Sequence, residues 1–133
     1  MQITKQADYA LRAVMYLAKL PPNNRAATRH IAQEQAIPPS FLAKIIAQLS
    51  IAGMISTSRG AHGGVSLAKP SEKITVLDVV EAIDGPLALN ECTLNPSNCP
   101  LIEGCPLHSV WCEAQSEMVS KLRNTNFASV VAS

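Results

Sequence analysis

The segment from residue 39 to residue 68 constrains the fold of this chain more than any other. Pro39 suits the first position of a helix because its missing N–H would be unpaired there, and Gly53 is expected to end that helix. Two β-compatible arms follow at residues 54–58 and 65–68, and a glycine-rich loop joins them. A helix that runs directly into such a hairpin is typical of a winged helix-turn-helix.

The preceding residues supply the rest of this motif. Thr28 is expected to cap a short helix that runs to about Gln35, with the turn of the motif at residues 36–38. An earlier helix is predicted over residues 7–19, and the pair of prolines that follows ends it. We therefore expect a mainly α fold with a small β-wing, in which residues 1–71 form a winged helix-turn-helix domain.

The predicted helix that starts at Pro39 has two faces of different chemistry. At about 100° per residue, one arc carries only large apolar side chains: Phe41, Leu42, Ile45, Ile46 and Leu49. The opposite arc carries Ser40, Lys44 and Gln48, flanked by small alanines. Short polar groups with one cation can lie close against a DNA groove, whereas a solvated face more often carries many Glu and Lys residues. An ordinary amphipathic helix gives the same pattern, so this pattern alone does not establish a DNA-binding helix, and other parts of the chain are needed as evidence.

Charge divides the chain into two unequal parts. Residues 1–75 carry nine Lys/Arg and three Asp/Glu, a net charge of +6, whereas residues 76–133 carry two and seven, a net charge of −5. A basic part is what a phosphate-binding surface requires, although chance also produces such asymmetry. In the wing, Arg59 can enter a narrow minor groove, and the glycines let the backbone approach phosphates. The candidate residues for binding double-stranded DNA are Thr28, Ser40, Lys44, Gln48, Arg59, Gly60, Gly63 and Gly64.

Residues 72–133 are expected to form a second unit with a sensor helix, a loop and a last helix. Thr75 and Asp78 form a plausible capping box for the first helix, which Gly85 ends. The last helix begins at Pro106 and carries a few strong apolar anchors on an otherwise polar surface: Leu107, Val110, Trp111, Ala114, Met118 and Leu122. This pattern predicts packing against a second copy, and the alternative is that the helix folds back on its own domain.

Three cysteines lie in the loop at residues 87–108, as Cys92-x6-Cys99-x5-Cys105, and His108 follows. Thiolates are soft ligands for iron–sulfur clusters, zinc or copper(I), and a structural zinc site commonly uses closer Cys-x2-4-Cys pairs. The wide, uneven spacing favours a cluster. The alternatives that stay open are a regulator with a metal-free thiol switch, a zinc-stabilised interaction module without a DNA role, and buried small side chains. Cys112 is interpreted as a packing cysteine of the last helix. His30 and His62 lie in the basic half without partner residues in the sequence, and we expect them to face solvent or phosphate.

Several classes of protein are excluded by what the sequence lacks. No apolar run approaches the roughly 18 residues needed to span a bilayer, and Met1 leads into a helical pattern rather than a signal segment. We therefore expect a cytoplasmic protein without a membrane partner, whose cysteines are thiols or metal ligands rather than disulfides. No nucleophile elbow, metalloprotease motif or P-loop lysine is present, so we expect neither an enzyme nor a small-molecule substrate.

Taken together, these segments resemble a known family. The resemblance runs from Met1 to about Phe127, and it depends on four stretches: Ile3-Thr4-Lys5 with Asp8-Tyr9-Ala10-Leu11-Arg12, Phe41-Leu42-Ala43-Lys44-Ile45, Arg59-Gly60-x-x-Gly63-Gly64 with Leu67-Ala68, and the loop cysteines closing in Cys105-Pro106-Leu107-His108. It is similar to the iron–sulfur winged-helix transcriptional regulators that include IscR, NsrR and RirA. Members respond to iron supply, cluster occupancy, redox state or nitric oxide.

The resemblance implies a homodimeric repressor that binds a palindromic operator and an iron–sulfur cluster. Cys92, Cys99 and Cys105 match the three cluster thiolates of the family. The fourth ligand is His108 in IscR-like members, or an aspartate from the partner subunit at the position of Asp8 in NsrR-like members. The spacing from Cys105 reproduces the histidine-type motif and favours His108. The resemblance implies a two-iron two-sulfur cluster, with a four-iron four-sulfur cluster as the alternative. Ala43 stands where IscR-like recognition helices carry an acidic residue, which puts IscR-type operator choice in doubt.

Overall fold

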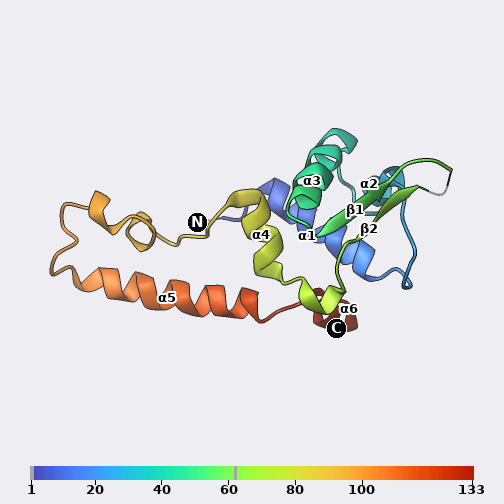
Figure 1. Ribbon diagram of the computed structural model, residues 1–133. Helices are drawn as coiled ribbons and strands as arrows, with labels where there is room; N and C mark the ends of the chain where they lie inside the picture. The colour runs from blue at the N-terminus through green and yellow to red at the C-terminus, as the bar shows by residue number, and fades with distance from the viewer. Residues whose placement is uncertain (1, 62) are drawn as a thin grey trace.

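The computed structural model describes residues 2–61 and 63–133, so His62 in the wing loop lies outside the described residues. The N-terminal part contains three helices and a two-stranded antiparallel sheet (Figure 1): α1 Lys5–Ala18, α2 Thr28–Glu34, α3 Pro39–Ile51, β1 Ile55–Ser58 and β2 Gly64–Leu67. The prediction of a mainly α fold with a small β-wing is confirmed. Two of its local predictions are wrong, at Thr28 and at Phe41.

Helix α1 forms the centre of the N-terminal body. Its N-cap is Thr4, whose hydroxyl accepts a hydrogen bond from the Ala7 N–H at 3.1 Å. One face of the helix is buried over its whole length by small and medium side chains: Ala7, Ala10, Ala13, Val14 and Leu17. The small alanines let α3, α4 and α6 approach α1 closely, and all three contact it.

Helices α2 and α3 form the predicted helix-turn-helix. Thr28 was expected to cap α2, but the cap position is Ala27, without a side-chain hydrogen bond, and Thr28 is the exposed first residue of the helix. Phe41 was expected on the buried arc of α3, but it is 43% exposed and its ring lies 6.0 Å from the ring of Tyr9. The rest of the predicted apolar arc is buried: Leu42, Ile45, Ile46 and Leu49.

The wing is joined to the body by its second strand. Ile55 pairs with Leu67 and Ser58 pairs with Gly64 across the hairpin. On its other side Val65 forms a β-bridge with Ala26, with N–H···O distances of 2.9 and 2.8 Å. The wing is therefore held at its base by backbone bonds, while its tip extends away from the body (Figure 1).

The remaining residues begin with the short turn η1 Ser71–Lys73 and helix α4 Val76–Asp84. The predicted capping box is present, because the Thr75 hydroxyl accepts from the Asp78 N–H and the Asp78 carboxylate accepts from the Thr75 N–H, both at 3.0 Å. The chain ends in α6 Phe127–Ala132, which the sequence analysis did not predict. Phe127 is 2% exposed in the main core, and a β-bridge joins Thr75 to Asn126.

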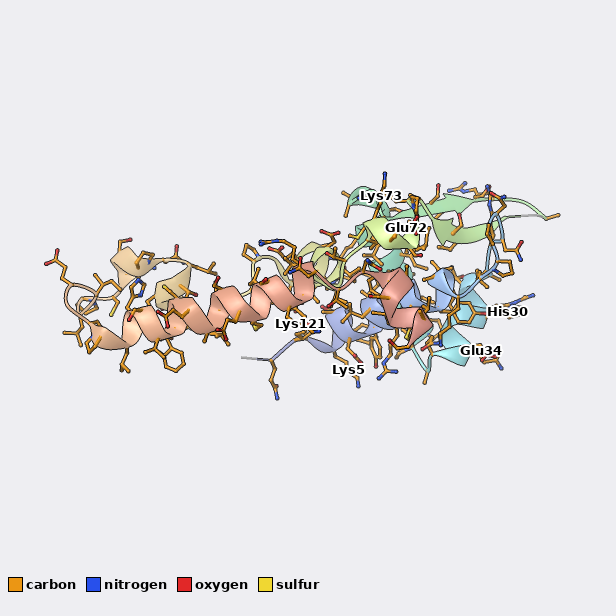
Figure 2. The ribbon with its side chains drawn as sticks, turned by 90° about the horizontal axis from the view of Figure 1, so that it is seen from below. Lys5, His30, Glu34, Glu72, Lys73 and Lys121 are labelled. Atoms are coloured by element: carbon orange, nitrogen blue, oxygen red, sulfur yellow. The ribbon has the colours of Figure 1, made fainter. Side chains whose placement is uncertain are left out.

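Between α4 and α6 lie two short turns, η2 Glu91–Thr93 and η3 Pro96–Asn98, and the long helix α5 Pro106–Arg123. The end of α5 near Lys121 lies against the body, and the rest of the helix extends away from it in both views (Figures 1 and 2). A small cluster of Leu77, Val80 and Leu87 holds this end against Leu122 and its neighbours. In the described part of the chain, no helix is long and apolar enough to cross a membrane.

Candidate DNA interface and cysteine site

The outer face of α3 carries the side chains that the sequence analysis placed there. Ser40 and Lys44 are exposed, and Gln48 is half-buried one turn further along. Ala43 and Ala47 lie exposed between them, so no large side chain prevents close approach to this face. The buried side of α3 fixes the orientation of this face, because Leu42 and Leu49 are at most 1% exposed in the core.

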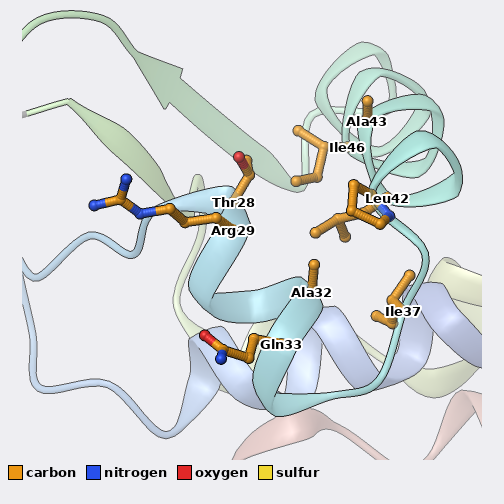
Figure 3. Close-up of a pocket in the computed structure, with 9 residues that line it drawn as sticks. Thr28, Arg29, Ala32, Gln33, Ile37, Leu42, Ala43 and Ile46 are labelled. Atoms are coloured by element: carbon orange, nitrogen blue, oxygen red, sulfur yellow. The ribbon is translucent and has the colours of Figure 1, made fainter.

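A mostly apolar groove of about 600 Å³ separates α2 from α3 beside this face (Figure 3). Thr28 lies at the edge of the groove, while the guanidinium group of Arg29 points away from it into solvent (Figure 3). Arg29 and the exposed Arg25 were not among the predicted DNA-binding residues. The only sequence signal for them was the excess of positive charge before residue 75.

In the wing, close backbone contacts and backbone conformation explain why three positions are glycine. A Cβ on Gly63 would overlap the carbonyl oxygen of Ser58, and one on Gly64 would lie 2.8 Å from the carbonyl oxygen of Ala26. Gly60 has φ +100°, a conformation that favours glycine, and its carbonyl accepts from the Gly63 N–H at 2.9 Å. These contacts shape a tight turn next to the exposed Arg59.

The three loop cysteines, each half-buried, line a single cavity of about 340 Å³ at the far end of α5. Cys92 lies in η2, Cys99 follows η3, and Cys105 is the N-cap residue of α5. His108 lines the same cavity from the first turn of α5. The structure thus brings together the four predicted ligands of this chain, although they are spread over 17 positions of a proline-broken loop.

Polar contacts hold this loop in place. The Asn90 side chain accepts from the Glu91 N–H at 3.0 Å, and the Asn90 carbonyl accepts from the Thr93 hydroxyl at 2.7 Å. The Leu89 N–H donates to the Gln115 side-chain oxygen of α5 at 3.0 Å, which ties the start of the loop to the helix. These bonds keep the cysteine-bearing turns beside α5.

The thiols interact electrostatically. Partial desolvation, followed by repulsion from the other thiols, raises the pKa of the Cys92 thiol above its ordinary value. Among the thiols Cys112 contributes most, then Cys99 and Cys105. In the described residues, no three His, Cys, Asp or Glu side chains converge closely enough to hold a single metal ion. Three thiols and one imidazole among the residues that line this cavity suit the chemistry of an iron–sulfur cluster, which is larger than one ion.

Cys112 was interpreted as a packing cysteine, but within this single chain it packs into no core. Its side chain is exposed, and its Sγ lies 3.6 Å from Nε2 and 3.9 Å from Nδ1 of His108. The helix α5 has no buried residue, so there was no core for Cys112 to enter. The alternative ligand Asp8 does not line the cavity of its own chain, and it pairs with Arg12 at 3.1 Å.

Comparisons with known proteins identify the family of the chain and match its fold. Residues 3–133 match the Rrf2 family, described as an iron-dependent transcriptional regulator. CymR, the global cysteine regulator of B. subtilis, is 22% identical with a TM-score of 0.86, over 99% of this chain and 97% of that one. IscR of T. potens is 23% identical with a TM-score of 0.80, over 99% and 87%. A Listeria innocua protein described as a transcriptional regulator is 28% identical with a TM-score of 0.85, over 99% and 87%.

Proposed function

Because the chain belongs to the Rrf2 family of transcriptional regulators, we propose that it is a homodimeric repressor whose affinity for a palindromic operator is controlled by an iron–sulfur cluster. The observation that carries the proposal is the shared cavity of Cys92, Cys99 and Cys105. Three soft donors in one cavity are a ligand set, whereas three unrelated packing cysteines would be dispersed through a core.

DNA binding is proposed for the outer face of α3 and for the wing. Ser40, Lys44 and Gln48 would lie in the major groove, where their side chains reach base edges and phosphates. Arg59 at the wing would approach the minor groove or the flanking backbone, and Arg29 at the start of α2 an adjacent phosphate.

The dimer is proposed to form through α5. This helix of 18 residues has no buried residue, and Leu107, Val110 and Trp111 are 58%, 51% and 37% exposed. At about 100° per residue, Val110 lies on the opposite side of the helix from Cys112, which faces His108 of the thiol site. A second copy that covers the Val110 side removes Val110 from water, while Leu107 and Trp111 also line the cysteine cavity and lie nearer the thiol side.

The cysteines connect the cavity to the position of the DNA-binding face. A cluster bound there would supply a centre that reacts with oxidants and nitric oxide and whose assembly depends on iron. Cys92 and Cys99 lie on the loop and Cys105 is the N-cap residue of α5, so shared ligation would fix the loop against that helix. His108, or Asp8 of the partner subunit, would be the fourth ligand. Release of the thiolates would free the loop and change how two copies of α5 pack.

That packing decides operator affinity because two recognition helices must match successive major grooves, about 34 Å apart. The base of α5 contacts α4, and α4 contacts both α1 and α3. A change in the packing of two α5 helices is therefore passed through α4 to the spacing of the two α3 helices. It shifts the population between binding and non-binding forms.

The cluster is tested by purification without oxygen, followed by iron and sulfide analysis and a visible absorption spectrum. The wild-type chain is expected to be coloured, and Cys99→Ala is expected to lose at least about tenfold in iron and sulfide at unchanged helix content. Ser97→Ala, an exposed change in the same turn, is the matched control. A Cys99→Ala protein as coloured as the control would contradict the ligand assignment.

DNA binding is tested through its salt dependence. Arg59→Ala is expected to weaken binding to duplex DNA and to reduce the slope of log affinity against log salt by about 1, since one phosphate contact is lost. Fluorescence anisotropy at several salt concentrations measures both quantities. Glu103→Ala, an exposed charge of the cysteine loop, is the control. An Arg59→Ala slope equal to that of the control would remove the wing from the interface.

A second candidate is a regulator on the same fold that senses through its thiols without a cluster. The structural likeness to CymR, a global cysteine regulator, favours it. The same purification separates the two candidates. Colourless protein that loses free thiols in proportion to added oxidant would support the thiol sensor.

A further inference from the structure

The exposed face of α3 has two halves of different chemistry. At about 100° per residue, the methyl groups of Ala43 and Ala47 lie on one side of Lys44, and the Gln48 amide lies on the other. Ala43 also lines the mostly apolar groove between α2 and α3, so the groove continues the alanine half (Figure 3). A surface that packs against this face therefore meets methyl groups along one edge and an amide along the other.

Helix α3 lacks the side chains that recognise G·C pairs most specifically. Among its 13 residues Lys44 is the only charged one, so the helix carries no arginine for guanine and no carboxylate for the amino group of cytosine. Lysine can bind guanine, but its ammonium group is a flexible point charge that binds a phosphate equally well. Apart from this lysine, the strongest contacts to G·C pairs are therefore missing from the helix.

The side chains that α3 does present match the edge of an A·T pair. In the major groove, adenine offers the N7 acceptor and the N6 amino group, and thymine offers its C5-methyl group. A glutamine amide donates to N7 and accepts from the amino group, and an alanine methyl packs against the thymine methyl. Gln48 supplies the amide, and the exposed Ala43 and Ala47 supply the methyl groups.

The wing favours the same base composition through the other groove. Arg59 is the only lysine or arginine between residues 55 and 67, and its side chain is exposed beside the tight turn at Gly60. Runs of A·T pairs narrow the minor groove and strengthen its negative potential, which attracts arginine. This observation is independent of α3, because it concerns a different element and a different groove.

We infer that each operator half-site of this protein is rich in A·T pairs, with adenine bound by Gln48, thymine methyl groups packed against the two alanines of α3, and a narrow minor groove under Arg59. This assignment rests on the proposed binding of DNA and adds the class of sequence that is bound. It does not depend on which ligands hold a cluster.

The first test selects bound duplexes from a library of random sequence, with protein purified without oxygen and with metal-free protein. The selected half-sites are expected to hold A·T pairs at most protected positions. Half-sites rich in G·C pairs, or without any preference, would overturn the inference and leave the proposed function intact. A protein that binds no duplex in either form, even at low salt, would contradict the proposed function and the inference with it.

The second test removes single methyl groups from the DNA. Deoxyuridine in place of one thymidine of the selected half-site is expected to weaken binding about fourfold where an alanine covers the methyl group. The same replacement outside the half-site is the control. In Ala43→Gly, the thymine that faced this residue is expected to lose its effect. The ratio of affinities is measured within each protein, so the lower helix stability of the glycine variant does not enter it. Equal affinities for both duplexes at every thymine of the half-site would overturn the inference.

The third test pairs Gln48→Ala with an adenine analogue that has carbon in place of the N7 nitrogen. Wild type is expected to bind the substituted half-site about fivefold more weakly, because one hydrogen bond is lost, and Gln48→Ala to bind both duplexes alike. Glu103→Ala, an exposed side chain of the cysteine loop, is the control and should keep the wild-type ratio. A Gln48→Ala protein as sensitive as this control would overturn the assignment of adenine to Gln48.

Discussion

Helices α1 and α5 are the two longest of the described residues, and they use their apolar side chains in different ways. Five residues of α1 are buried, four of them completely, whereas none of the 18 residues of α5 is. The apolar spacing in the sequence predicted a helix in both places. It therefore identifies which side of a helix is covered, but it does not tell whether the same chain or another chain covers it.

The largest expected effect concerns the part of the molecule that buries its own surface. Phe127→Ala is expected to lower the free energy of unfolding by about 3–5 kcal/mol, because it leaves a cavity in the core beside α1. Chemical denaturation measures this change. The matched control is Leu101→Ala in the cysteine loop, where the side chain is 74% exposed and truncation is expected to cost less than about 0.5 kcal/mol. Similar losses of unfolding free energy in both variants would contradict the difference between the buried core and the exposed loop.

An intermediate effect is expected on the exposed side of α5. Val110→Glu introduces a charge where a second copy is proposed to pack, and the dimer is expected to dissociate at least about tenfold more readily. Sedimentation equilibrium over a range of concentrations measures this, and circular dichroism should report unchanged helix content. Ser116→Glu adds the same charge on another side of the helix and should leave the dimer intact. Equal association of both variants would mean that α5 pairs through a different face.

The smallest expected effect concerns the N-terminal caps of α1 and α5. Thr4→Ala removes the side-chain cap of α1 and is expected to cost about 1 kcal/mol of unfolding free energy. Cys105 occupies the N-cap of α5 without a side-chain cap bond, so Cys105→Ala in metal-free protein is expected to change that energy by less than about 0.5 kcal/mol. Thermal denaturation of both variants, prepared without metal, provides the test. A loss for Cys105→Ala as large as that for Thr4→Ala would give its thiol a structural role.

Much of the fold could be predicted because its signals are local. The Thr75–Asp78 capping box, the prolines that start α3 and α5, and the glycines of the wing each determine a boundary within a few residues. The missed helix α6 also has a local signal, since the Asn126 side chain accepts from the Ser129 N–H at 2.9 Å. Its six residues are too few for a periodic pattern, and its stability comes from the tertiary burial of Phe127.

The candidate sites were predictable to different degrees. The polar face of α3 follows from helical spacing, because its opposite side is strongly apolar and fixes its rotation. The three loop cysteines were identified by residue type. Whether they line a common cavity depends on the tertiary arrangement of the loop, which the sequence does not determine. The surroundings of Cys112 could not be predicted for a related reason. In a helix without a buried side, sequence does not determine which residues turn toward a neighbouring loop.

The β-bridge between Thr75 and Asn126 has a consequence for how such proteins diversify. It brings the start and the end of the long insertion that contains α4, the cysteine loop and α5 to one place on the body. An insertion whose two ends are neighbours can be lengthened, shortened or given a different ligand chemistry without moving its points of attachment. Evolution can therefore exchange the sensing chemistry of this part while the surface that reads DNA keeps its geometry.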